Sequence, residues 1–71
     1  MLNIELFTPY SETYTFELLD LAGRIIYTSS VSTIKGVNNN QMDVSQFSKG
    51  MYMLVVKNGN GFEKQSRIAV E

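Results

Sequence analysis

Seven acidic and six basic side chains are the candidates for chemistry in this 71-residue chain, which has no histidine and no cysteine. The commonest general base is therefore missing, and so are the thiolates that act as nucleophiles or soft-metal ligands. Paired carboxylates would be the remaining route to acid-base catalysis, but no two acids share such a motif. The acids are Glu5, Glu12, Glu17, Asp20, Asp43, Glu63 and Glu71. We expect surface carboxylates, no enzyme, no cofactor and no metal.

Asparagines 38 to 40 and Asp43 come nearest to a metal-binding loop. A calcium loop places acidic ligands at alternate positions and closes with a glutamate, and this stretch has neither feature. Gly36 and the three asparagines therefore predict a loop without a metal site. The net charge is -1 and no basic stripe occurs, so nucleic acid is not an expected partner.

The pentapeptide DLAGR, residues 20–24, has the chemistry of a tight turn. Asp20 at the first position can accept hydrogen bonds from the turn backbone, and Gly23 at the fourth accepts the left-handed conformation. We predict a three-residue hairpin loop that closes with a glycine bulge. The turn does not require a leucine at position 21 or an arginine at position 24. This indicates that another molecule recognises these two side chains.

Apolar and polar side chains alternate with a period of two, and this pattern predicts the strands that position the turn. Pro9 interrupts the pattern and indicates a loop after the first strand. The run MYMLVV, residues 51–56, is apolar at every position, which is typical of a central strand covered on both faces. The expected strands are 2–7, 14–19, 24–29, 31–34, 41–44, 51–56 and 62–70.

The end of the chain predicts a second hairpin. Either the first or the second Asn-Gly pair of NGNG, residues 58–61, can occupy its tight turn, and both registers stay open. The strand that follows can turn Phe62, Ile68 and Val70 toward a core.

Phe47, Gly50 and Tyr52 are spaced as a corner that leads into the strand at 51–56. A tyrosine near the start of such a strand stabilises immunoglobulin-like domains when its hydroxyl bonds to upstream backbone. Any helix is limited to a single turn near 43–47. The sequence predicts an all-β fold, an immunoglobulin-like antiparallel β-sandwich of six to seven short strands.

Two segments, FELLDLAGRIIYTSSV and DVSQFSKGMYMLVVKNGNGFEKQSRIAV, together resemble the type A C-terminal sorting domain of the type IX secretion system, also called the Por secretion system. The family pattern is an Asp-Leu-x-Gly-Arg turn, a Leu/Phe-x-x-Gly-x-Tyr corner, and two strands that end in a basic residue and an apolar tail. The matching residues are Asp20, Leu21, Gly23 and Arg24, then Phe47, Gly50 and Tyr52, then Arg67, Ile68 and Val70. The resemblance covers nearly the whole chain.

This resemblance implies that residues 1–71 are a single sorting domain, lacking a first N-terminal segment because the family opens with Pro-Asn-Pro further upstream. It implies a non-catalytic signal that directs a larger cargo protein across the outer membrane of a Gram-negative bacterium. The implied partners are the outer-membrane translocon, a sortase-like peptidase and the N-terminal cargo domain. The implied location is the periplasm in transit, then the cell surface or extracellular space. A strand edge left uncovered by the missing segment is open to self-association.

We expect the translocon to recognise Leu21, Arg24, Arg67 and the final strand with Ile68 and Val70, because a guanidinium group pairs bidentately with carboxylates. The alternative is a non-catalytic β-sandwich accessory module that binds glycan or protein. Four Tyr and four Phe side chains are present for that purpose, but there is no Trp. Most of these aromatic residues fall at positions that a core would use.

Overall fold

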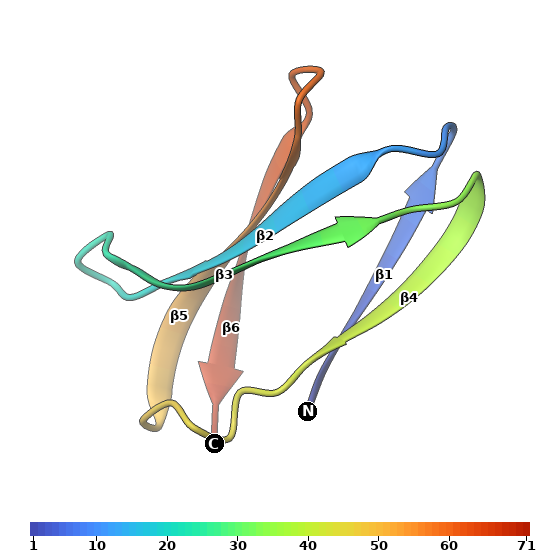
Figure 1. Cartoon of the computed structure of the whole chain (residues 1–71). Helices are drawn as coiled ribbons and strands as arrows, with labels where there is room; N and C mark the ends of the chain where they lie inside the picture. The colour runs from blue at the N-terminus through green and yellow to red at the C-terminus, as the bar shows by residue number, and fades with distance from the viewer.

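In the computed structural model, which describes all 71 residues, six strands form two antiparallel sheets and no helix is present (Figure 1). The strands are β1 (Leu2–Thr8), β2 (Thr13–Leu19), β3 (Ile25–Ser32), β4 (Gly36–Met42), β5 (Gly50–Asn58) and β6 (Glu63–Val70). β1 pairs with β4, and the other four strands form a sheet in the order β3-β2-β5-β6. The all-β sandwich predicted from the sequence is confirmed. The chain has no helical segment long and apolar enough to cross a membrane.

The core lies between the small β1-β4 sheet and the inner face of the four-stranded sheet. Phe16 and Leu18 of β2 stand opposite Val56 and Leu54 of β5 on that face, and Leu18 has no solvent exposure. Alternate positions of the small sheet close the core from the other side. The buried cluster consists of Ile4, Tyr14, Phe16, Leu18, Met42, Tyr52, Leu54, Val56 and Val70.

The predicted loop at Gly36 and asparagines 38 to 40 is wrong, because these residues belong to β4, which pairs with β1 along its whole length. The Asn38 carboxamide forms hydrogen bonds with backbone groups of the turn before the strand. Its Nδ2 donates to the Ile34 carbonyl at 2.9 Å, and its Oδ1 accepts from the Ile34 N–H at 2.9 Å. Tertiary pairing with β1 therefore overrides the low strand propensity of asparagine.

Two short strands predicted beside this region are also absent as separate strands. Residues 31–34 do not form a strand of their own, because β3 continues to Ser32 and Ile34 lies exposed in the turn before β4. Residues 41–44 do not form a separate strand either. The first two belong to β4, which ends at Met42, and the last two follow it. A hydrogen bond from the Phe47 N–H to the Val44 carbonyl, at 3.1 Å, closes a single turn instead of a helix.

β5 is a central strand, as predicted, but the prediction that both of its faces are covered is wrong. Met51 is 45% exposed and Met53 is half-buried, whereas Val55 on the same outer face is buried. Val55 stands opposite Glu17, whose carboxylate forms an ion pair with Lys57 at 3.1 Å. The second sheet has only two strands and covers one face, so no sheet lies over the other face of β5.

The predicted corner before β5 is confirmed. The Tyr52 hydroxyl donates a hydrogen bond to the Ser48 carbonyl, and the Phe47 ring lies 6.3 Å from the Tyr52 ring. Gly50 has a φ of +151°, where a side chain would be strained. Phe47 also packs edge-on against Tyr27 of β3, at 6.1 Å between ring centroids. The corner thus connects the end of the small sheet to the inner face of the large one.

The hairpin loop at 58–62 uses neither of the two-residue registers predicted for NGNG. The Asn58 N–H donates to the Phe62 carbonyl at 3.1 Å, and the Asn58 Oδ1 accepts from the N–H groups of Asn60 and Phe62 at 2.9 and 3.0 Å. Gly61 has a φ of +91°, whereas Asn60 is not in the positive region that a two-residue Asn-Gly turn requires. The loop therefore has three residues, and the glycine at its end supplies the left-handed conformation.

This 58–62 loop is tied to the rest of the molecule. The two carboxylate oxygens of Glu12, in the β1-β2 connection, accept from the Asn58 and Asn60 side-chain amides at 2.8 and 3.0 Å. The Phe62 ring packs edge-on against Tyr14 at 5.8 Å. Burial and the neighbouring Glu12 carboxylate raise the pKa of Tyr14. Glu12 is thus a structural anchor and not one more solvated acid.

Candidate recognition surface

The predicted three-residue loop at 20–24 is confirmed, and Asp20 organises it. The Asp20 N–H donates to the Arg24 carbonyl at 2.9 Å, and the Asp20 Oδ1 accepts from the N–H groups of Ala22 and Arg24 at 3.0 and 2.9 Å. Gly23 has a φ of +89°. All of these contacts lie within the pentapeptide, so the loop is held without help from the sandwich.

Arg24 has a role in the loop that the sequence did not reveal, which corrects the expectation that the turn gives it none. Its Nε donates to the Asp20 Oδ2 at 2.7 Å, so the guanidinium group closes the turn from outside. The backbone N–H and the guanidinium group of Arg24 together hold the pKa of Asp20 below its usual value. The Arg24 side chain is still 81% exposed, and its remaining N–H groups are available to a partner.

Leu21 lies in the 20–24 loop and is 72% exposed. The loop is one of two hairpin ends that extend away from the sheets, the other being the 58–62 loop (Figure 1). A leucine held this far out of the core contributes little to folding, so its side chain is available for contact with another molecule.

Arg67 lies on the outer face of the large sheet, at the same end as this loop. Its cross-strand partner is Met53 of β5, and Met53 in turn pairs with Leu19, the residue immediately before Asp20. Arg67 is exposed and takes part in neither of the two ion pairs. The structure thus brings Arg67 and the 20–24 loop, which are far apart in the sequence, to one surface.

Ile68 and Val70 point the other way, as the alternation predicted. They pair with Tyr52 and Gly50, and Val70 is one of the buried core residues while Ile68 packs against that core. Both side chains hold β6 on the sandwich. The surface of β6 that another protein can reach is its outer face and its free edge.

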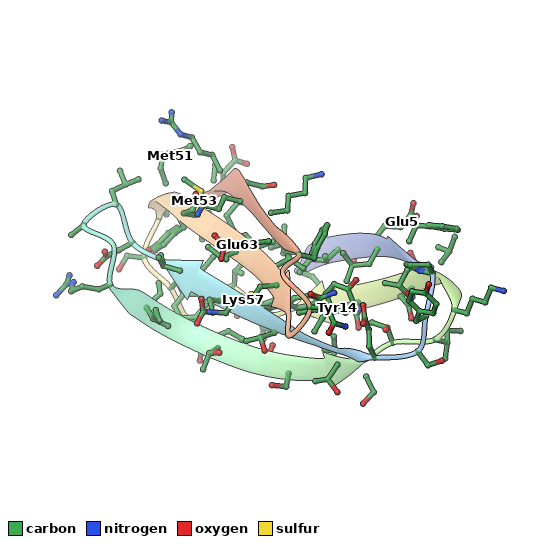
Figure 2. The ribbon with its side chains drawn as sticks, turned by 90° about the horizontal axis from the view of Figure 1, so that it is seen from above. Glu5, Tyr14, Met51, Met53, Lys57 and Glu63 are labelled. Carbon is green, nitrogen blue, oxygen red and sulfur yellow. The ribbon has the colours of Figure 1, made fainter.

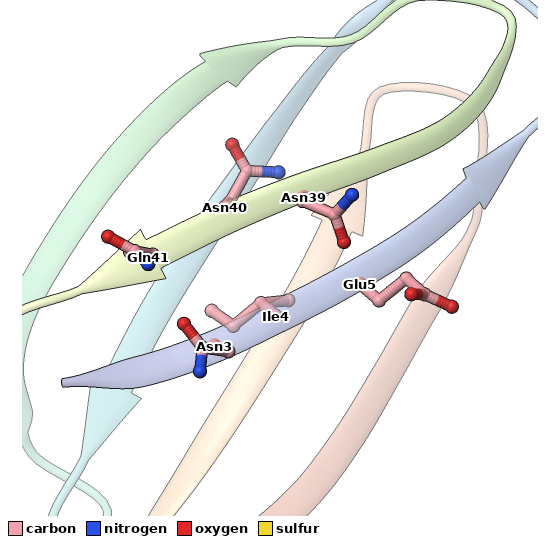
Figure 3. Close-up of a pocket in the computed structure, with 6 residues that line it drawn as sticks. All are labelled: Asn3, Ile4, Glu5, Asn39, Asn40 and Gln41. Atoms are coloured by element: carbon pink, nitrogen blue, oxygen red, sulfur yellow. The ribbon is translucent and has the colours of Figure 1, made fainter.

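The outer face of the small sheet carries a different chemistry. An open groove there is lined mainly by carboxamide side chains and one carboxylate (Figure 3). Asn3 stands opposite Gln41 and Glu5 opposite Asn39 across β1 and β4. The lining residues are Asn3, Ile4, Glu5, Asn39, Asn40 and Gln41.

Carboxylates do not gather anywhere into a potential metal site. No group of three or more acidic side chains lies close enough to hold an ion. Asp43, the acid that follows the asparagine run, accepts a hydrogen bond from the Ser45 N–H at 3.0 Å, and the contacts with Ser45 lower its pKa.

A comparison with protein-family models matches residues 1–71, the whole chain, to the secretion system C-terminal sorting domain. The chain belongs to this family. The sorting domain is a C-terminal signal of the type IX secretion system, and it is part of a protein exported through the cell envelope. Its family is not known for catalysis. Searches of curated proteins and of solved structures returned no match.

Membership in the family also implies two classes of partner for the sorting domain. One is the type IX secretion machinery, and the other is the cargo that precedes the domain in the chain. The residues of the family pattern occupy three kinds of position, and Phe47, Ile68 and Val70 pack in or against the core. Asp20, Gly23, Gly50 and Tyr52 shape turns, whereas Leu21, Arg24 and Arg67 are exposed at one end of the outer face.

Proposed function

We propose that this sorting domain carries an N-terminal cargo protein from the periplasm across the outer membrane and delivers it to the cell surface or the medium. The translocon of the type IX system recognises the folded sandwich, and a sortase-like peptidase then cuts upstream of it. The observation that supports this proposal is a family match over the whole chain together with exposed motif residues on one surface. No catalytic group is required of the domain itself.

In this proposal Leu21, Arg24 and Arg67 make the first contacts with the translocon. The two guanidinium groups pair with carboxylates of the receptor, and Leu21 enters an apolar site. Ile68 and Val70 act indirectly, because their packing keeps β6 and Arg67 in place.

Export of a fusion protein tests the proposal. Residues 1–71, preceded by a short upstream segment, are joined to a periplasm-directed reporter in a bacterium that has the type IX system. We expect surface delivery of the reporter and a strong loss of delivery for Arg24→Ala combined with Arg67→Ala. The matched control is Lys35→Ala combined with Lys64→Ala, which removes two exposed cations elsewhere. Delivery that is unchanged in the Arg24→Ala/Arg67→Ala variant would remove these contacts from the proposal.

A glycan-binding accessory module is the second candidate function, and the carboxamide groove of the small sheet favours it (Figure 3). Amide groups pair with sugar hydroxyls, and Phe7, 77% exposed at the end of β1, offers a ring for stacking. Saturable micromolar binding to a glycan panel, lost in Asn39→Ala, would support this candidate. The same panel without binding, in a chain that exports its reporter, leaves sorting as the function.

A further inference from the structure

The outer face of the large sheet carries a row of apolar side chains that ends in Arg67. Leu19 of β2 pairs with Ile25 of β3 on one side and with Met53 of β5 on the other, and Met53 pairs with Arg67 of β6. Cross-strand partners share a face, so these four residues form one line across the sheet. Three inter-strand steps of about 4.8 Å make the line roughly 14 Å long. We call it the outer row.

Solvent reaches the outer row because no second sheet covers this face. Ile25 is 56% exposed, and Met51, the next outward position of β5 after Met53, is 45% exposed. Figure 2 shows Met51 and Met53 near one end of β5 and Lys57 further along it. A shift in the β2-β3 register beside Leu19 leaves Ile26 without a ladder partner, and Ile26 is also exposed. An uncovered apolar cluster of this kind marks an interaction surface.

Guanidinium groups stand at both ends of the outer row. Arg67 closes one end, and Arg24 directly precedes Ile25 at the other. The one acid in the adjoining loop, Asp20, has its carboxylate occupied by three hydrogen bonds. Glu71, at the end of the chain, forms no ion pair with Arg67. Arg67 therefore carries an unpaired positive charge at its end of the row, whereas Arg24 is paired with Asp20 and offers its remaining N–H groups.

We infer that the outer row is the docking site for an extended segment of the translocon that presents apolar side chains flanked by carboxylates. This inference rests on the proposed sorting function and names the chemistry of its partner. Apolar contact with Leu19, Ile25 and Met53 supplies the affinity, and the two arginines fix the position of the segment. A second copy of the domain fits less well, because it would bring a second unpaired Arg67 charge with it.

Peptide binding to the isolated chain tests the chemistry without any secretion system. The probes are an eight-residue peptide of alternating leucine and glutamate and a control of alternating leucine and lysine. We expect the glutamate peptide to shift the NMR signals of Leu19, Ile25 and Met53, and to bind about tenfold more tightly than the lysine peptide. Equal binding of both peptides, or shifts confined to the β1-β4 sheet, would overturn the inference. So would self-association that shifts the same signals without peptide.

Export of the reporter fusion tests the site in the cell. Ile25→Thr combined with Met51→Thr removes exposed apolar surface while keeping strand propensity, and we expect about tenfold less surface delivery. Phe7→Thr combined with Val37→Thr is the matched control, because it removes exposed apolar side chains from the small sheet. Thermal unfolding of each variant shows whether it is folded.

The two tests separate the inference from the proposed function. Wild-type delivery by a folded Ile25→Thr/Met51→Thr variant overturns the docking site and leaves sorting intact. A wild-type fusion that is not delivered counts against sorting itself. If the variant unfolds, the peptide comparison on the unmodified chain still decides the inference.

Discussion

The 20–24 and 58–62 loops have the same backbone conformation but differ in their contacts with the rest of the molecule. Each starts with a side chain whose Oδ1 accepts two backbone N–H groups, Asp20 in one and Asn58 in the other. Each also has a left-handed glycine at its fourth position, with φ of +89° at Gly23 and +91° at Gly61. The two different sequences DLAGR and NGNGF thus form the same type of turn.

The loops differ in what their remaining polar and aromatic groups contact. The 20–24 loop directs its second carboxylate oxygen to Arg24 in the same loop. The 58–62 loop directs its amides to Glu12 and its aromatic ring to Tyr14. One loop is self-contained and keeps the Leu21 and Arg24 side chains exposed, whereas the other is fixed to the sandwich. Identical turn chemistry therefore leaves one loop exposed, where we propose recognition, and fixes the other to the sandwich.

Valine at either left-handed glycine should have the largest effect. Gly23→Val and Gly61→Val each force a β-branched residue into positive φ, which should lower the free energy of unfolding by about 2 kcal/mol. Thermal denaturation should show a melting temperature lower by roughly 10 °C for both. Gly59→Val is the control, because Gly59 is not in the positive region and a Cβ there meets no atom within 4 Å. Unequal losses at Gly23 and Gly61 would show that the turns are not equivalent.

Removal of the first side chain of each loop should lower the free energy of unfolding by different amounts in the two loops. Asn58→Ala loses both of its accepted backbone bonds and the bond to Glu12, a loss of about 1.5 kcal/mol. Asp20→Ala should cost less, because its contacts are exposed and end within the loop. Urea denaturation of the two variants measures the difference. A larger loss at Asp20 would contradict the view that only the 58–62 loop is anchored.

The last residue of each loop sharpens the contrast further. Phe62→Ala should destabilise the fold by about 1 kcal/mol, because the edge-on contact with Tyr14 is lost. Arg24→Ala should cost about 0.5 kcal/mol or less, since the Arg24 side chain is largely solvated. Both values come from denaturant titration of the single variants. A marked destabilisation by Arg24→Ala would mean that this residue belongs to the fold and not to a recognition surface.

The smallest expected effect is the part of the pH dependence that comes from Asp20 in the 20–24 loop. The folded pKa of Asp20 lies below its ordinary value of 3.8. Its stabilising contribution is therefore complete above that value and is lost as the pH falls through the lowered folded pKa. Melting temperatures measured between neutral and strongly acidic pH should show this loss in the wild type and a reduced loss in Asp20→Asn. Identical acid profiles would argue against the Asp20 hydrogen bonds.

Local patterns in the sequence predicted the parts of the fold that depend on neighbouring residues. The turn at 20–24, the corner of Phe47 and Tyr52, and the inward direction of Ile68 and Val70 are all confirmed. The asparagine run was the main failure, because Asn38 is a poor strand former by itself. It becomes part of β4 only when β1 lies alongside and its carboxamide finds the Ile34 backbone.

The candidate site divides in the same way. The sequence identified Leu21, Arg24 and Arg67 as residues to examine, but it could not place Arg67 beside the loop, since that needs the β2-β5-β6 strand order. It also assigned Met51 and Met53 to a covered strand. An apolar residue looks the same in a sequence whether its sheet face is covered or open.

The amino-acid sequence by itself determined an all-β chain, the type of turn at 20–24 and the sorting family. These depend on periodicity, on a carboxylate and a glycine at fixed spacing, and on ordered short motifs. Only the tertiary structure decided which face stays open, which hairpin loop is anchored by Glu12, and that Leu19, Met53 and Arg67 lie in one line. The physical reason is that strand order and sheet coverage arise from long-range pairing, which no short segment specifies.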